Sequence, residues 1–301
     1  SSSLSSSSSS SSSSAASREE EEGISKYSNN SNSEMGEGEG GEEDPATANR
    51  FVEAVKWFRR AAEQGHAQAL HSLGVCYEAG RGVQCDPERA LSCYSRAAQL
   101  GSPEAAASVG YFMLCEGKYE QAVKHLRQAA EQNVKEAFYS LGQMYHHGLY
   151  VPREPTTAYA YYSSAAALRH PLAQLQVGHC LFSGSGTQQD YKAAFDSYTQ
   201  SAEQGVAEAA NSLGIMSEEG HGCRKDVSAA AGWYAKAAEG GSADAWYNLG
   251  LLLEQGKHPN SAGSDADFQK ALHHYHRAAE SGSMPAQIRL AELAKLIGKA
   301  A

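Results

Sequence analysis

The residues of this sequence that are equipped for chemistry are a few histidines and one serine. His273, His274 and His276, in ALHHYHRAAE, are of a type that binds metal ions, and Glu280 follows one helical turn later. On a helix, His273 and His276 are one turn apart, whereas His274 lies on another face. We therefore interpret this stretch as surface residues around a core Tyr275, and we predict no metal site.

Two further candidates also favour a structural role over a catalytic one. His146 and His147 stand at the end of an expected helix, where an imidazole suits the helix dipole, and no carboxylate or cysteine lies within four residues of them. Ser185, in FSGSGT, lacks the G-x-S-x-G pattern of a nucleophile elbow, and the G-x-G turns lack the lysine of a phosphate-binding loop. The sequence predicts no catalytic residue, no cofactor and no enzyme activity.

The strongest pattern in the sequence is a phrase that recurs along the chain. AAEQGHAQALHSLG stands at residues 61–74 and SAEQGVAEAANSLG at 201–214, and five weaker copies give seven in all. The fifth residue of each copy serves as a marker, and successive markers are 36, 32, 36, 36, 36 and 41 residues apart. A fixed period of this length is typical of a repeat architecture. The markers are Gly65, Gly101, Asn133, Arg169, Gly205, Gly241 and Gly282.

Each copy has the residue spacing of two helices. Alanine stands eleven before, three before and four after every marker, and a large, mostly aromatic residue stands seven before it. Such three- and four-residue spacings are typical of helices. We name the segment before each marker helix B and the segment after it helix A. A glycine stands nine after six of the markers, and because mid-helix glycine costs about 1 kcal/mol relative to alanine, we expect close backbone packing there.

The unit LGVCYEAGRGVQCDPERALSCYSRAAQLG, with its G-x-G turn, its aspartate and its closing glycine, resembles the Sel1-like repeat, a relative of the tetratricopeptide repeat. The resemblance covers about residues 51 to 297. It departs in the second copy, which reads CEGKYEQ, in the third, which reads GLYVPRE, and in the seventh, where Ala291 replaces the glycine. It implies an all-α fold, an α-solenoid in which helical hairpins form a right-handed superhelix around one core. The aspartates of the unit suit helix N-caps.

The same resemblance implies a binding surface. In tetratricopeptide-like arrays helix A lines the concave face, and its unpacked positions are roughly three, six, ten and thirteen after the marker. Aromatic, apolar and amide side chains on such a face suit a peptide or a partner helix. Tyr139, Leu175 and Phe182 have an alternative interpretation, as fillers of gaps between helices. The candidate groove residues are Tyr111, Tyr139, Gln143, His146, Leu175, His179, Phe182, Asn211 and Tyr247.

The first 45 residues differ from the array in composition. They are rich in serine and then in acidic residues, so we predict a disordered tail at 1–45 and the repeat array at 46–301. Residues 1–50 hold 3 basic and 10 acidic groups, or −7 of the formal charge of −10, which leaves −3 for the rest. A nearly neutral array argues against nucleic acid as a partner. No apolar run approaches the length of about 18 residues that spans a membrane, so we expect no membrane insertion.

The six cysteines show no pattern of pairs. Only Cys76 and Cys180 share a repeat position, and three repeats separate them, which is too far for a disulfide. We therefore expect reduced thiols and a cytoplasmic or nuclear location.

These patterns together predict a non-catalytic adaptor that holds a protein or peptide partner in the groove of the solenoid. Members of the family that the chain resembles serve as scaffolds in membrane-protein degradation complexes or as activators of enzymes such as chitin synthase. Two alternatives stay open. One is a hydrolase-type enzyme, of the kind assigned to some bacterial relatives, and the other is a purely structural subunit of a large complex.

Overall fold

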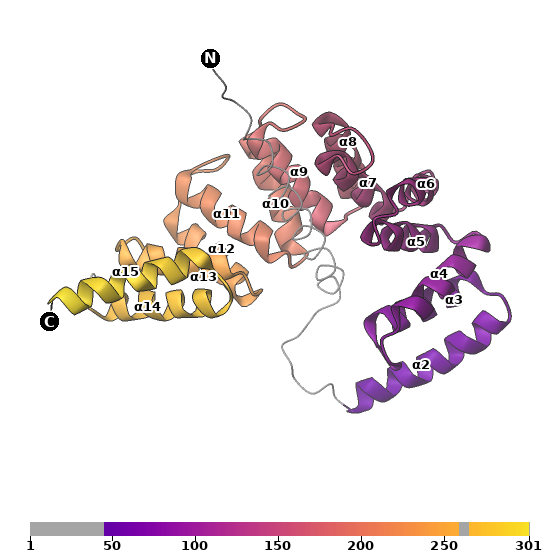
Figure 1. The fold of residues 1–301 in the computed structure, drawn as a ribbon. Coiled ribbons are helices and arrows are strands. Elements are labelled where there is room, and N and C mark those ends of the chain that lie inside the picture. Colours follow the sequence, from indigo (N-terminus) through magenta and orange to yellow (C-terminus); the bar gives the residue numbers. More distant parts are fainter. Residues whose placement is uncertain (1–44, 259–264, 301) are drawn as a thin grey trace, which may run out of the picture. The chain divides into compact units, whose positions relative to one another are not determined.

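The structure is a computed structural model that describes residues 45–258 and 265–300. In these residues the chain forms fourteen α-helices and no strand, which confirms the predicted all-α fold (Figure 1). The tail predicted for residues 1–45 lies outside the described residues, except for Pro45, where the first helix begins.

Helices B and A alternate along the chain as the repeat period predicts. The B helices are α2 (Pro45–Glu63), α4 (Pro87–Gln99), α6 (Tyr119–Ala130), α8 (Pro155–Ala167), α10 (Tyr191–Glu203), α12 (Val227–Glu239) and α14 (Asp265–Glu280). The A helices are α3 (Ala67–Ala79), α5 (Pro103–Cys115), α7 (Lys135–His147), α9 (Pro171–Ser183), α11 (Ala207–Glu219), α13 (Ala243–Glu254) and α15 (Met284–Ala300).

The ends of the helices follow from the sequence. Every marker residue has a positive φ, which is the left-handed conformation that ends helix B, and this holds even for Asn133 and Arg169. The three predicted N-cap aspartates, Asp86, Asp190 and Asp226, each accept a hydrogen bond of 3.0 Å from the backbone amide three residues on. The boundaries of each hairpin are therefore set by local chemistry.

The mid-helix glycines mark close packing, but against a side chain rather than against backbone as we expected. A Cβ atom at Gly142 would lie 2.6 Å from Cδ1 of Tyr162, the large residue of the next helix B. The absent Cβ thus makes room for the side chain on which the hairpin closes. The pairs are Gly74 with Tyr94, Gly110 with Leu126, Gly142 with Tyr162, Gly178 with Tyr198, Gly214 with Tyr234 and Gly250 with Tyr275.

The second glycine of each G-x-G turn has a separate role. In the turn after α9, a Cβ atom at Gly186 would overlap the backbone carbonyl of Pro155, where the preceding helix B begins. Gly222 meets the carbonyl of Tyr191 in the same way, and Gly82 meets that of Phe51. The turn of one repeat therefore packs backbone to backbone on the N-terminal half of the previous helix B.

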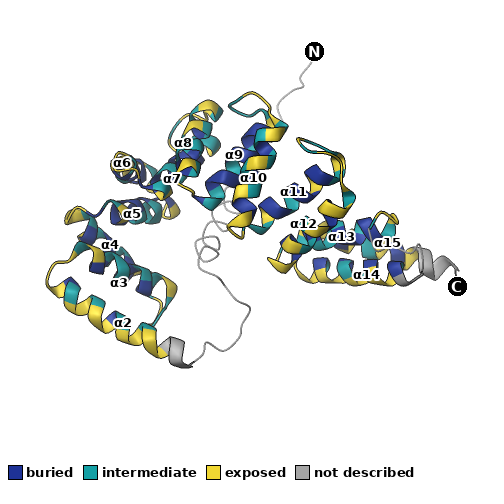
Figure 2. Cartoon of the chain, turned by 180° about the vertical axis from the view of Figure 1, so that it is seen from behind, coloured by how far each residue is buried: buried dark blue, intermediate teal, exposed yellow. Residues whose placement is uncertain are grey.

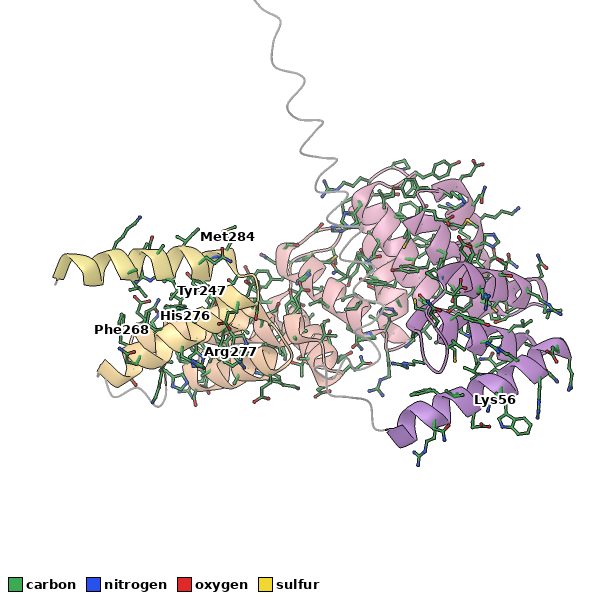
Figure 3. All side chains as sticks on the ribbon, turned by 60° about the horizontal axis from the view of Figure 1, so that its bottom comes forward. Lys56, Tyr247, Phe268, His276, Arg277 and Met284 are labelled. Atoms are coloured by element: carbon green, nitrogen blue, oxygen red, sulfur yellow. The ribbon has the colours of Figure 1, made fainter. Side chains whose placement is uncertain are left out.

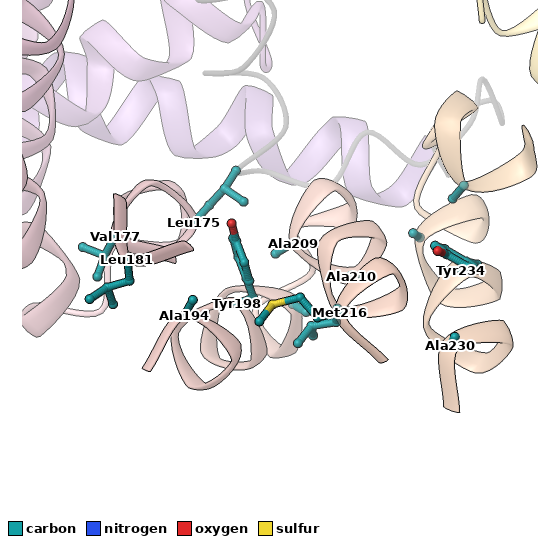
Figure 4. Close-up of a cluster of buried hydrophobic side chains, with 14 of the residues drawn as sticks. Leu175, Val177, Leu181, Ala194, Tyr198, Ala209, Ala210, Met216, Ala230 and Tyr234 are labelled. Atoms are coloured by element: carbon teal, nitrogen blue, oxygen red, sulfur yellow. The ribbon is translucent and has the colours of Figure 1, made fainter. Parts of the chain in front are cut away.

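The described residues divide into two compact units, one that ends at Gln132 and one that begins at Asn133. Within each unit every described helix packs against the next one in the chain, which is the packing of an α-solenoid. Buried residues concentrate where neighbouring helices face each other (Figure 2). The core of the first unit surrounds Tyr94, and the main core of the second includes Tyr198, Met216 and Tyr234 (Figure 4). That residues 46–301 act as one domain stays a prediction.

Candidate partner-binding surface

The A helices of the second unit carry most of the predicted groove residues. The positions six, ten and thirteen after each marker on α7, α9, α11 and α13 form what we call the A-helix surface. Its twelve residues are Tyr139, Gln143, His146, Leu175, His179, Phe182, Asn211, Ile215, Glu218, Tyr247, Leu251 and Glu254. Tyr111, a further predicted groove residue, belongs to α5 in the first unit and is half-buried beside Cys115.

Two of the predicted groove residues are interior residues. Leu175 is 1% exposed and packs into the main core of the second unit, near Tyr198 (Figure 4). Gln143 is 4% exposed on α7. Burying an apolar side chain such as leucine is favourable by about 2 kcal/mol. The alternative interpretation of Leu175 as a gap filler is therefore the correct one, and neither side chain is available to a partner on the surface.

Tyr139 is half-buried and tied to the fold by its ring. Its ring stacks on that of His170 with centroids 4.5 Å apart, and the ring of Tyr162 lies 5.9 Å away. His170 in turn caps α9, because its Nδ1 accepts a hydrogen bond of 3.2 Å from the amide of Ala173. Burial is the main cause that lowers the pKa of His170, to about 4, so the imidazole is neutral and its Nδ1 accepts at neutral pH.

Two histidines of the A-helix surface are also held neutral. Burial lowers the pKa of His146, and the nearby His147, Arg153 and His179 add to the effect. Burial lowers the pKa of His179 as well, while Glu208 opposes the shift from 3.9 Å. The His179 side chain remains 38% exposed. At neutral pH these side chains therefore present uncharged rings to a partner.

Phe182 belongs to a small aromatic group at one edge of the A-helix surface. Its ring lies 5.2 Å from that of Tyr191 and 5.8 Å from that of His221, and these two stack on each other at 4.7 Å. His221 is also paired with Glu219 at 2.9 Å. The group joins α9, the start of α10 and the turn after α11. Ring contacts from two other elements therefore hold the Phe182 side chain in place.

The last two predicted groove residues are linked to neighbouring helices. Asn211 accepts a hydrogen bond of 3.0 Å from Nδ2 of Asn248, which joins α11 to α13. Tyr247, labelled in Figure 3, packs its ring 5.7 Å from that of Tyr275. Both are half-buried, and each keeps part of its surface open.

Position thirteen differs between copies in a way that bears on function. Where it is a glutamate, the tyrosine of the next helix B donates a hydrogen bond to it: Tyr234 to Glu218 at 3.2 Å and Tyr275 to Glu254 at 2.6 Å. Tyr94 and Glu78 form the same pair in the first unit, at 2.6 Å. In α7 and α9 this position holds His146 and Phe182 instead. A hydrogen bond to a charged group is worth about 1.5–3 kcal/mol, so α7 and α9 carry a ring where α3, α11 and α13 carry a stabilising pair.

Two apolar members of the surface, Ile215 and Leu251, were not among the predicted groove residues. Ile215 of α11 is 37% exposed at position ten, between the half-buried Asn211 and the paired Glu218, and Leu251 of α13 is half-buried. The signal for both was present, because position ten also holds the predicted His179. The importance of His170 was not visible from the repeat pattern, since its ring contacts Tyr139 of α7 from the N-cap of α9, and the whole of α8 lies between them in the chain.

The other candidates for chemistry have structural positions. His273 and His276 are exposed on α14, and His276 is labelled in Figure 3, while the ring of His274 stacks on Trp246 at 5.3 Å. In the described parts of the chain no group of three His, Cys, Asp or Glu residues is placed to hold a metal ion. Within the same residues, no helix has the length and apolar character needed to cross a membrane. Burial raises the pKa of the Cys180 thiol to about 11.

The chain was compared with protein families and known proteins. The Sel1 repeat model matches at residues 34–66, 67–102, 103–134, 136–170, 171–206, 207–242 and 243–283. Chitin synthase regulatory factor 3 of Schizosaccharomyces pombe is 32% identical over 124 residues, which are 39% of this chain and 13% of that protein. DAP3-binding cell death enhancer 1 of Rattus norvegicus is 44% identical over 52 residues, 17% of this chain and 10% of that protein. The chain thus spans only a small part of these two relatives.

Solved structures agree with the sequence comparison. A Sel1 repeat protein from Oxalobacter formigenes superposes with a TM-score of 0.67 at 27% identity, covering 78% of this chain and 96% of that one. A protective antigen of uropathogenic Escherichia coli strains, described as displaying an SLR fold, gives a TM-score of 0.64 at 32% identity, over 80% of this chain and 52% of that one. With seven matched repeats and this shared architecture, the chain belongs to the Sel1 repeat family.

Proposed function

We propose that this protein is a non-catalytic adaptor and that the A-helix surface of its second unit binds a protein partner. Partly exposed aromatic, apolar and amide side chains stand at equivalent positions of four successive A helices. The residues that carry the proposal are Tyr139, His179, Phe182, Asn211, Ile215 and Tyr247.

The observation that favours binding most is the use of position thirteen. In α11 and α13 this position holds a glutamate that anchors a core tyrosine, whereas in α7 and α9 it holds His146 and Phe182. An aromatic ring with part of its surface open is a common anchor of protein interfaces, because it offers a large rigid contact area. The presence of a ring instead of a glutamate at these two places is understandable if the rings contact a partner.

The neighbouring groups indicate the chemistry of that partner. Neutral imidazoles, the Ile215 side chain and the amide of Asn211 offer apolar contact together with hydrogen bonds, which suits a helix or an extended segment of a polypeptide. The names of two relatives describe a regulator of chitin synthase and an enhancer of cell death that binds DAP3. A role as a regulatory subunit fits these names.

The experiment that tests this proposal is affinity capture with the full chain as bait. The surface variant carries His179→Ala, Asn211→Ala and Ile215→Ala, which truncate partly exposed side chains. Loss of one interface anchor weakens binding by about 2 kcal/mol, roughly thirtyfold, so three losses should abolish capture by a micromolar complex.

The control variant carries Lys192→Ala and Asp196→Ala on α10, both exposed and both away from the A-helix surface. Proteins captured by the wild type and by the control, but not by the surface variant, are expected. If capture survives in the surface variant and disappears in the control variant, another face binds partners.

A further inference from the structure

A small cavity in the second unit is lined mainly by polar side chains. Its volume is about 310 Å³, and it lies where the B helices α8 and α10 end, beside the start of α9. Its polar lining consists of Gln174, Gln200, Gln204, Arg169 and Glu203, with Ala166 and Ala167 as the apolar part. It shares no residue with the A-helix surface.

Three carboxamides in this cavity form a single hydrogen-bonded chain. Gln174 is 3% exposed, and its Nε2 donates to Oε1 of Gln200 at 3.1 Å. Its Oε1 accepts from Nε2 of Gln204 at 2.5 Å. The chain leaves the Nε2 of Gln200 at one end and the Oε1 of Gln204 at the other, and both of these residues are exposed. Turning all three amides over exchanges the two ends but again leaves one donor and one acceptor.

Such a chain of amides is prepared for one kind of ligand group. A carboxamide has both a donor and an acceptor, so it can accept from one end of the chain and donate to the other. A carboxylate has no proton for the accepting end, and an ammonium group has no lone pair for the donating end. Hydrogen bonds in series polarise one another, which strengthens the terminal donor and acceptor.

The residues that build the cavity depart from the other copies. Five residues after the marker, five of the other six A helices carry apolar side chains, among them Leu70, Phe138 and Ala210, whereas α9 carries the buried Gln174 and α15 carries the exposed Gln287. The marker itself is Arg169, which has a φ of 61° at a position that is glycine in five of the seven copies. A non-glycine residue in this conformation costs on the order of 1 kcal/mol. A buried glutamine at a mostly apolar position and an arginine at a mostly glycine position therefore lie at the same cavity.

From these observations we propose that the cavity is a second binding site, which takes the side-chain carboxamide of a glutamine or asparagine on a partner polypeptide. Arg169 and Glu203 stand at its rim as one cation and one anion, so they favour partner segments with charged residues next to the amide. The site is independent of the function proposed above, since it lies on the B-helix side and uses other residues.

The test uses the full chain labelled with ¹⁵N and two probes of equal size. N-acetyl-glutamine methylamide carries the carboxamide, and N-acetyl-glutamate methylamide carries a carboxylate in its place. A ligand of this size binds with a Kd on the order of 1 mM. We expect the glutamine probe to shift the side-chain amide signals of Gln200 and Gln204 with saturation in the millimolar range, and the glutamate probe to bind at least tenfold more weakly.

One variant removes the site without leaving a buried amide unpaired. It combines Gln174→Leu, which restores the residue type of Leu70, with Gln200→Ala and Gln204→Ala. The matched control is Gln128→Ala with Gln132→Ala, at the same two repeat positions around the end of α6, where the preceding helix α5 carries Ala106 in place of Gln174. When the glutamine probe is added, we expect no change in the backbone amide chemical shifts around α8 and α10 of the first variant. In the control variant, we expect the same chemical-shift changes as in the wild type.

Three results would overturn the proposal. The first is a glutamate probe that binds as tightly as the glutamine probe, which would show that the cavity does not recognise carboxamides. The second is a titration of the triple variant that matches that of the wild type. The third is the absence of saturable shifts with either probe in the wild type.

Discussion

Gly142 is the residue that shows most directly how a hairpin closes, because its missing Cβ leaves room for the ring of Tyr162. Gly232 of α12 is a natural comparison, since a Cβ there would meet nothing within 4 Å. Alanine raises helix propensity equally at both positions, by about 1 kcal/mol. We therefore expect Gly232→Ala to stabilise the protein by up to about 1 kcal/mol and Gly142→Ala to destabilise it.

Urea unfolding measures both free energies, and Gly142→Val is expected to lose more than about 2 kcal/mol because the branched side chain displaces the tyrosine further. Equal gains from alanine at positions 142 and 232 would show that the ring can move aside, and the close-packing account would fail.

His170 makes stability depend on pH. Its pKa is lowered to about 4 from 6.5, chiefly by burial. Between pH 6.5 and 4, this histidine is therefore protonated in the unfolded chain but not in the folded chain. The free energy of unfolding decreases as the pH falls from 6.5 towards 4. Over that window the loss attributable to this residue is roughly 3 kcal/mol.

His170→Asn keeps a capping acceptor for α9 without a titrating group. We expect its free energy of unfolding to fall less between pH 6.5 and 4 than that of the wild type. Part of the pH dependence should remain, because burial also lowers the pKa of His274 to about 4. Parallel profiles for wild type and variant would mean that His170 is not the group that titrates.

At the scale of elements, the G-x-G turn has two glycines with different tasks. Gly184 and Gly186 both have a φ of 74°, so alanine suffers the same backbone strain at either position. A Cβ at Gly184 would touch Gln189 at an ordinary 3.4 Å, whereas a Cβ at Gly186 would overlap the carbonyl of Pro155. We expect Gly186→Ala to destabilise the protein by at least about 1 kcal/mol more than Gly184→Ala.

Thermal and urea melts of the two single variants check this difference directly, with each serving as the control of the other. Equal losses would leave only the shared φ as the reason for both glycines, and the turn would have no packing role on the preceding helix B.

Helices and caps could be predicted from the sequence because they depend on neighbours in the chain. The markers and Asp86, Asp190 and Asp226 all act within a few residues of themselves, and the structure confirms them. The sequence did not show whether a side chain or a helix backbone packs against each mid-helix glycine, because either kind of neighbour requires a residue without a Cβ atom.

The candidate site was predictable only in outline. The positions that face outward follow from the repeat, but individual exposure depends on the size of neighbours. Leu175 and Gln143 are interior residues, while Ile215 at an equivalent position stays partly open. The amide chain joins Gln174 to Gln200 and Gln204, which are 26 and 30 positions further along the chain, so no local sequence pattern predicts it.

At the scale of the whole molecule, the central claim is that a partner lies on the A-helix surface of the second unit. Site-specific photo-cross-linking of the full chain tests it most directly. A benzophenone amino acid replaces Ile215 on α11 in one protein and the exposed Asp196 on α10 in the other. We predict a discrete protein adduct from position 215 that position 196 does not give, and competition by unlabelled wild type but not by the surface variant. An adduct that forms at position 196 alone, or equally at both positions, would contradict the account.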